Sequence, residues 1–141
     1  MHAPGGVGIR RRFAAMVADE RGSSPVEFVL VGTLLTLLTL GVIQFGLVVY
    51  VRNVVHDAAV EGAYHAALAD TALDEGIQRT RQIVTRTVGG EYAAEITVQE
   101  SGELGEPTVR ISVRAPLPLV GLLGPPRMME VTAHAPLESF E

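Results

Sequence analysis

The chain has 141 residues, no cysteine and a formal net charge of −5 at pH 7. The lack of cysteine excludes disulfide bridges and thiolate metal sites. An acidic chain also lacks the basic face that nucleic-acid binding requires, so we expect no nucleic-acid partner. About 50 residues belong to a leader and an apolar segment, which leaves about 90 for one small domain. A domain of that size offers little room for an enzyme active site.

The longest apolar segment runs from Phe28 to Val51 and contains 24 residues without a charge. As a helix, it would be about 36 Å long, because each residue adds about 1.5 Å. That length crosses a hydrocarbon core of about 30 Å. The segment also far exceeds the roughly 7 to 15 apolar residues of a cleaved signal peptide. It predicts a retained transmembrane helix, with the lipid bilayer as a partner.

Charge differs between the two sides of this segment. Four arginines and two acidic residues precede it, apart from Glu27 at its start, whereas seven arginines and thirteen acidic residues follow it. Positively charged flanks stay in the cytoplasm. We therefore expect a single-pass protein of the cytoplasmic (inner) membrane, with its N-terminus inside and its C-terminal domain outside. The predicted segments are a leader (1–22), a transmembrane helix (23–51) and an extracytoplasmic domain (52–141).

Small residues recur at every fourth position where the helical pattern continues beyond the apolar run. Such rows let another backbone approach closely. They can pack on the chain's own sheet or on a helix of another subunit, and the sequence leaves both alternatives open. One row consists of Ala58, Gly62 and Ala66, and the other of Ala59, Ala63 and Ala67.

A second helix, or a kinked continuation of the first, is predicted after a break near Asp70. Thr71 and Asp74 have the spacing of a capping box, which marks a helix start. The pair Gly89 and Gly90 is expected to end the helix. Its apolar stripe consists of Leu73, Ile77, Val84 and Val88.

Three later segments alternate between apolar and polar residues, which predicts strands at 94–99, 109–114 and 129–134. A sheet this small needs a helix to cover its apolar face. We therefore predict a membrane-anchored α+β fold, in which a long N-terminal transmembrane helix continues into a soluble helical region packed on a three-stranded antiparallel sheet. Charged residues on its polar face are expected to form weak cross-strand pairs; they are Glu95, Arg110, Arg114 and Glu130.

The connection between the second and third strands, residues 115–126, is apolar and contains four prolines. Proline keeps it out of a central strand. It can cover part of the domain, or it can form a patch for a partner subunit or for the membrane surface.

The junction before the apolar run has two interpretations. In the first, Ser24 is a helix N-cap, Pro25 is the first helical residue and Glu27 completes a capping box. In the second, a peptidase cuts between Gly22 and Ser23, and Glu27 becomes the fifth residue of the mature chain. The carboxylate of Glu27 can then pair with the new amine of Ser23 or with that of a neighbouring subunit.

Several features in this order resemble the TadE family of pilin-like proteins from the tight adherence (Tad) pilus system. They are the spacing of Gly22, Glu27 and Phe28, the apolar run, and the segments Gly-Val-Ile-Gln-Phe-Gly (41–46) and Ala-Ala-Val-Glu-Gly-Ala (58–63). Family members often carry a proline early in the run, where this chain has glycine and threonine (32–33).

The resemblance implies a minor pilin or pseudopilin that a prepilin peptidase matures and that acts in assembly of a Tad-type pilus or secretion apparatus. Its implied partners are that peptidase and other pilin-like subunits, and the resemblance leaves open both incorporation into a surface pilus and residence in the membrane. The resemblance implies that Glu27 and Phe28 serve peptidase recognition and assembly. The small-residue rows described above supply the residues predicted for helix packing, which are Ala58, Ala59, Gly62, Ala63 and Ala66.

The alternative function is an uncleaved, signal-anchored module that binds a partner in the cell envelope. Glu61 and His65 lie one helical turn apart, but two ligands are too few for a metal site. The sequence contains no glycine-rich phosphate loop, and its hydroxyl, histidine and carboxyl groups form no recognisable catalytic set. We therefore expect a non-enzyme without metal, cofactor or small-molecule substrate.

Overall fold

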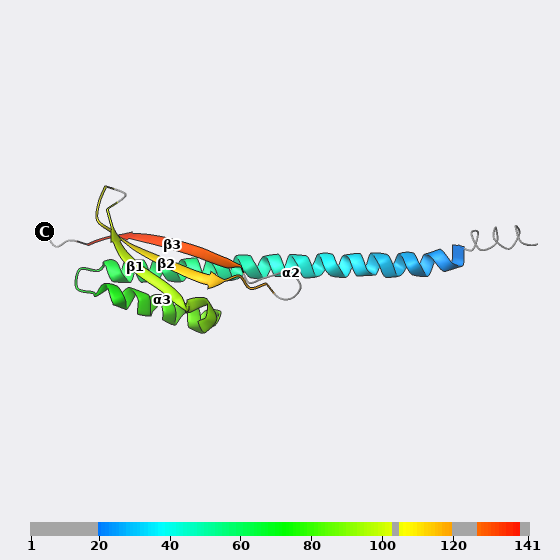
Figure 1. The fold of residues 1–141 in the computed structure, drawn as a ribbon, viewed down its shortest axis with the longest axis horizontal. Coiled ribbons are helices and arrows are strands. Elements are labelled where there is room, and N and C mark those ends of the chain that lie inside the picture. Colours follow the sequence, from blue (N-terminus) through cyan, green and yellow to red (C-terminus); the bar gives the residue numbers. More distant parts are fainter. Residues whose placement is uncertain (1–19, 103–104, 120–126, 139–141) are drawn as a thin grey trace, which may run out of the picture. The chain divides into compact units, whose positions relative to one another are not determined.

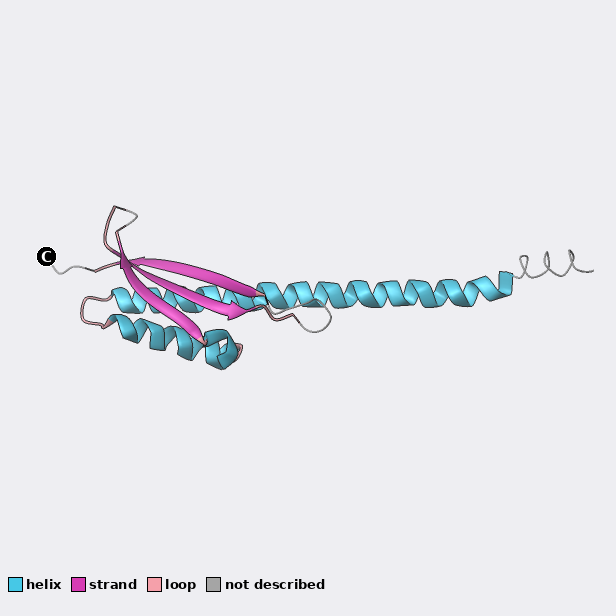
Figure 2. Cartoon of the chain, in the orientation of Figure 1, coloured by secondary structure: helices cyan, strands magenta, loops and turns pink. Residues whose placement is uncertain are grey.

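The computed structural model describes residues 20–102, 105–119 and 127–138. The chain forms two compact units, Met1–Val42 and Ile43–Glu141. The predicted leader lies almost wholly outside the described residues. The elements (Figures 1 and 2) are helix α2 (Glu20–Ala67), helix α3 (Leu73–Thr87), the short 3-10 helix η1 (Gly90–Ala93), and strands β1 (Glu95–Ser101), β2 (Thr108–Pro116) and β3 (Met128–Pro136).

The described part of the first unit is the N-terminal portion of α2, whose apolar side chains are exposed. Leu30, Leu34 and Leu38, for example, each expose more than 60% of their surface. The helix is long and apolar enough to cross a membrane, with a mean hydropathy of 2.2 in its most apolar stretch. This finding agrees with the predicted single-pass anchor.

Three threonines within the apolar run are hydrogen-bonded to their own helix. The hydroxyl groups of Thr33, Thr36 and Thr39 each donate to the carbonyl oxygen four residues earlier, at 2.8 Å. A hydroxyl group without a partner is costly in hydrocarbon, and these bonds avoid that cost. The threonines are therefore compatible with a lipid environment.

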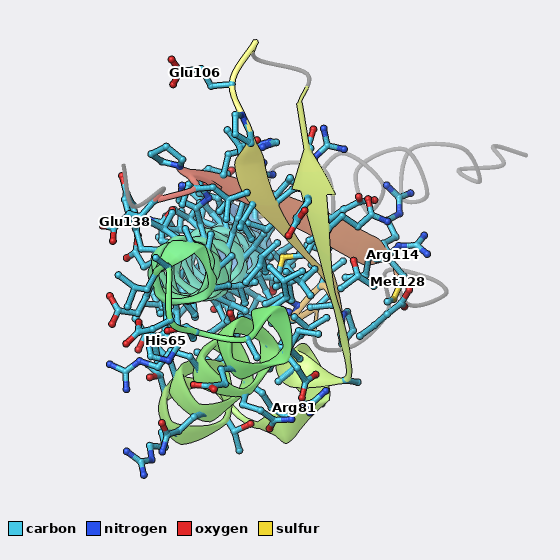
Figure 3. The ribbon with its side chains drawn as sticks, turned by 90° about the vertical axis from the view of Figure 1, so that its left-hand side faces the viewer. His65, Arg81, Glu106, Arg114, Met128 and Glu138 are labelled. Carbon is cyan, nitrogen blue, oxygen red and sulfur yellow. The ribbon has the colours of Figure 1, made fainter. Side chains whose placement is uncertain are left out.

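The second unit is the predicted α+β domain. Its sheet has the order β1-β2-β3 with both pairs antiparallel, and the register places Ile96 opposite Val113 and Val113 opposite Val131. The C-terminal part of α2 and helix α3 cover one face of this sheet (Figures 2 and 3). The predicted fold class is confirmed.

The core of this unit follows from the alternation in the strands. Along β3, every second residue from Met129 to Ala135 is buried, and β2 buries its apolar positions in the same way. The largest fully buried side chains come from α2, α3 and β2 together, so the core joins all three; they are Val55, Thr80, Val84, Val109, Ile111 and Val113.

The start of α3 differs from the prediction. Its N-cap is Ala72, which makes no side-chain capping bond, so the capping box of Thr71 and Asp74 was wrong. The backbone N–H of Thr71 instead donates to the Leu68 carbonyl at 3.1 Å. This turn places Thr71 too early to cap the helix.

The end of α3 agrees with the prediction. The helix stops at Thr87, and the N–H groups of Val88 and Gly89 both donate to the Val84 carbonyl oxygen, at 2.9 and 3.2 Å. Gly89 has a φ of +119°, a conformation open mainly to glycine. Helix η1, which the sequence did not predict, follows directly.

The proline-containing connection leaves the sheet as a continuation of the β2–β3 pair. The N–H of Leu117 donates to the Arg127 carbonyl at 2.7 Å, and Leu117 packs against the core. The described start of the connection thus covers part of the domain, whereas residues 120–126 lie outside the described part.

Candidate processing and assembly site

The junction lies inside α2 rather than at its start. The helix begins at Glu20, so Ser24 is not its N-cap and Pro25 is an interior residue. The capping-box interpretation of Ser24 and Glu27 is therefore wrong for this structure.

Pro25 weakens the first turns of α2. Proline has no N–H, so it leaves the carbonyl of Arg21 without its usual helical partner, and its ring crowds that carbonyl. Proline inside a helix costs about 3 kcal/mol, and glycine, here Gly22, costs about 1 kcal/mol relative to alanine. The peptide bond between Gly22 and Ser23 thus lies in a part of the helix that Gly22 and Pro25 weaken.

All four predicted junction residues are exposed in the first unit. Phe28 exposes 79% of its surface, and Gly22, Ser23 and Glu27 are also exposed. A Cβ atom added at Gly22 would meet nothing within 4 Å. Within the described chain, this segment is thus accessible to another protein.

The small-residue rows of α2 pack within the chain. Ala58, Ala59 and Ala63 are completely buried, Ala66 is 1% exposed, and Gly62 is buried as well. Of the two alternatives that the sequence left open, packing within the domain is the one observed. The buried rows are not available to a helix of another subunit while the domain keeps this fold.

The closest helix contact joins Gly62 of α2 to Gly76 and Thr80 of α3. The Thr80 hydroxyl lies 2.9 Å from the Gly76 carbonyl oxygen and 3.3 Å from that of Ala58, so it can donate to either. Sequence reasoning missed Gly76 and Thr80, because it searched α3 only for large apolar residues. Their four-residue spacing, which matches the rows of α2, was the available signal.

Two polar side-chain pairs lie beside this contact. Arg79 Nη2 is 3.0 Å from Glu61 Oε1, and His65 Nε2 is 3.7 Å from Glu75 Oε2. Glu61 and His65, which were considered as metal ligands, thus each have a partner on α3. Among the described residues, no group of three or more potential ligands is close enough to hold a metal ion.

Replacing Arg79 with glutamine is expected to change the free energy of unfolding by less than about 1 kcal/mol. The pair is roughly half exposed on both sides, so water already solvates the two charges. Urea unfolding of the full-length protein in detergent tests this. A much larger loss would show that the pair is structurally essential.

The face of the sheet away from the helices is polar. Arg114 lies between two acids, with Nη1 3.4 Å from Glu95 and Nε 3.9 Å from Glu130. These pairs are the predicted cross-strand contacts. Near the start of β1, burial and the carboxylate of Glu91 raise the pKa of Tyr92, so its phenol stays neutral at physiological pH.

A search of the curated proteins found no match, and a search of the solved structures found none either. The family model described as TadE-like protein does match, over residues 22–63. The match begins at the predicted junction and ends within the buried part of α2. The resemblance predicted from the sequence is thereby confirmed: residues 22–63 are similar to the TadE-like family.

Proposed function

We propose that the protein is a minor pilin or pseudopilin, a structural subunit that acts in assembly of a Tad-type pilus or secretion apparatus. The observation that carries the proposal is the TadE-like match, which begins at Gly22 and follows a 48-residue helix. A long helix with an apolar N-terminal part and a small α+β domain suits a subunit that is held in a membrane before assembly.

In this proposal, a prepilin peptidase cleaves between Gly22 and Ser23. The exposure of both residues and the weakness of the helix around Pro25 support it, because a peptidase must unwind the chain that it cuts. Cleavage removes the arginines of the leader and creates an amine at Ser23, in the first turns of the apolar helix.

Assembly then brings the N-terminal part of α2 against other pilin-like subunits. Its exposed apolar surface supports this role, since the corresponding surface of the C-terminal part is already buried in the domain. The protein acts as a structural component and not as an enzyme. It is a substrate of the peptidase.

The intact mass of the protein, measured from membranes of cells with and without the prepilin peptidase, tests the proposal. Loss of residues 1–22 only in the presence of the peptidase is the expected result. A full-length chain in both strains would overturn it and would favour an uncleaved, signal-anchored module. Gly22→Leu is the matched variant: a Cβ atom added at Gly22 meets nothing within 4 Å, so loss of processing would report on recognition by the peptidase.

A further inference from the structure

A backbone hydrogen bond joins the end of β3 to the end of α2 inside the second unit. The N–H of Glu138, just after β3, donates to the carbonyl oxygen of Ala67, the last residue of α2, at 3.0 Å. The C-terminal end of β3 therefore lies beside the C-terminal end of α2. From there β3 runs back along the N-terminal direction of α2 (Figure 1) and crosses obliquely over the helix (Figure 3).

This hydrogen bond also determines where the other end of β3 lies along the axis of α2. From Glu138 back to Met128 the chain covers about 33 Å at ~3.3 Å per residue, or about 25 Å along α2 if the strand is inclined by roughly 40°. The same distances along α2 correspond to about 17 to 22 residues. Met128 thus lies near the level of residues 45–50, the last turns of the uncharged run.

Helix α3 brings a second element to the same level. It runs antiparallel to α2, because Gly76 lies against Gly62 and Thr80 lies against both Gly62 and Ala58. Continuing in this direction places Arg86, in the last turn of α3, at about the level of Arg52 along α2. Both arginines are exposed.

In the second unit, the balance of arginines and acidic residues differs between the two ends of the domain along the axis of α2. The end where the uncharged run enters has four arginines and three acids among the described residues, and two of these acids are held by Arg114. The rest of the described domain from Arg52 onward has three arginines and eight acids. The first group is Arg52, Arg86, Arg114 and Arg127 with Glu91, Glu95 and Glu130; the second is Arg79, Arg81 and Arg110 with Asp57, Glu61, Asp70, Asp74, Glu75, Glu100, Glu106 and Glu138.

Two exposed side chains at the arginine-rich end suit the boundary between lipid and water. Met128 exposes 53% of its surface and lies on the outer side of the sheet near Arg114 (Figure 3). Tyr50 also exposes 53%, one residue before the uncharged run ends. Tyrosine is typical of membrane interfaces, and arginine can reach headgroups while its stem stays in apolar surroundings.

We propose that this end of the domain, formed by Tyr50, Arg52, Arg86, Arg127 and Met128, rests on the bilayer surface and binds anionic lipid headgroups. Tyr50 and Arg52 stand at the end of the uncharged run, so this surface begins where the chain is expected to leave the lipid. The arginines there supply the complementary charge, while the acidic remainder is repelled. The inference requires only the membrane anchor, so it stands whether or not the leader is cleaved.

The absence of cysteine allows a clean test with the full-length protein. Met128→Cys, labelled with a fluorophore, is reconstituted into phosphatidylglycerol-containing vesicles that carry nitroxide quenchers at headgroup depth. Glu106→Cys is the control, since this exposed residue precedes β2, whose first residue, Thr108, pairs with Pro136 at the opposite end of β3 from Met128. We expect strong quenching of the label at position 128 and little at position 106. Equal, weak quenching at both positions would overturn the proposal.

A second measurement tests the role of charge. Arg86→Gln and Arg127→Gln, added singly to the labelled protein, should each lower the ratio of docked to undocked domain by about fivefold in anionic vesicles. In vesicles of phosphatidylcholine alone, the same substitutions should have little effect. An equal loss in both lipids would contradict binding to anionic headgroups.

Diluting the protein in lipid distinguishes contact of this surface with lipid from contact with a second copy of the protein. Quenching that stays constant as the protein is diluted in lipid supports the proposal. Protection of the label that rises with protein density, without quenching by lipid, would identify this surface as a contact with a second copy and would overturn it. The mass measurement of leader cleavage is independent of all these outcomes.

Discussion

Gly62→Ala is expected to destabilise the domain by about 3 kcal/mol. The new Cβ atom would overlap the Thr80 hydroxyl oxygen, and it would lie 2.7 Å from the Gly76 carbonyl oxygen and 3.1 Å from Cδ1 of Ile111. Since one of these neighbours is backbone, α2 and α3 must move apart. That movement also separates the Thr80 hydroxyl from the Ala58 carbonyl.

The midpoint of urea unfolding measures this loss. Unfolding of the full-length protein in detergent is detected by its susceptibility to proteolysis. Gly90→Ala is the control, because its Cβ would have only an ordinary contact, 3.9 Å from Thr85, and should change stability by less than about 0.5 kcal/mol. Similar midpoints for the two variants would mean that the helices can separate at little cost.

Glu27→Gln is expected to leave membrane insertion intact and to impair assembly strongly. In the proposed mature chain, the carboxylate pairs with the amine of Ser23 or with that of a neighbouring subunit. Two opposite charges 4 Å apart attract by about 4 kcal/mol at an effective dielectric constant near 20, before the cost of desolvation is subtracted. Glutamine removes that attraction while it keeps the shape of the side chain.

The measurement compares the amount of assembled apparatus with the amount of protein in the membrane. Ser24→Ala is the control, because Ser24 belongs to the capping box that the structure does not contain. It should assemble normally. Normal assembly of Glu27→Gln would contradict a role for the carboxylate in pairing, and equal defects in both variants would restore the capping interpretation.

Much of the fold could be predicted because its determinants are periodic. The uncharged run from Phe28 to Val51 predicted the long helix, and alternation around Ile96, Ile111 and Val131 predicted the three strands with their buried faces. These patterns report burial, which local sequence determines directly. The strands extend further than expected, because β3 reaches Pro136 and the central strand β2 includes Pro116, which the sequence had assigned to the connection.

The remaining features depend on contacts between distant residues. Gly76 and Thr80 are buried because Gly62 lets α3 approach, which a search for large apolar side chains does not detect. The start of α2 was also missed, since Ser24 and Glu27 fit a capping box equally well when the helix begins earlier. At the candidate site, the sequence identified the junction residues and their order, whereas the structure was needed to find them exposed within a helix.

The alignment of β3 with α2 has a mechanical consequence. A pull on the end of β3, directed away from the membrane anchor, acts along the strand, and β3 must slide past β2 to yield. Their register pairs nine residues, so the hydrogen bonds between the two strands are loaded in shear and must break together. A force across the strands would instead peel these bonds apart one after another. The domain is thus built to resist tension along the direction of its own helix.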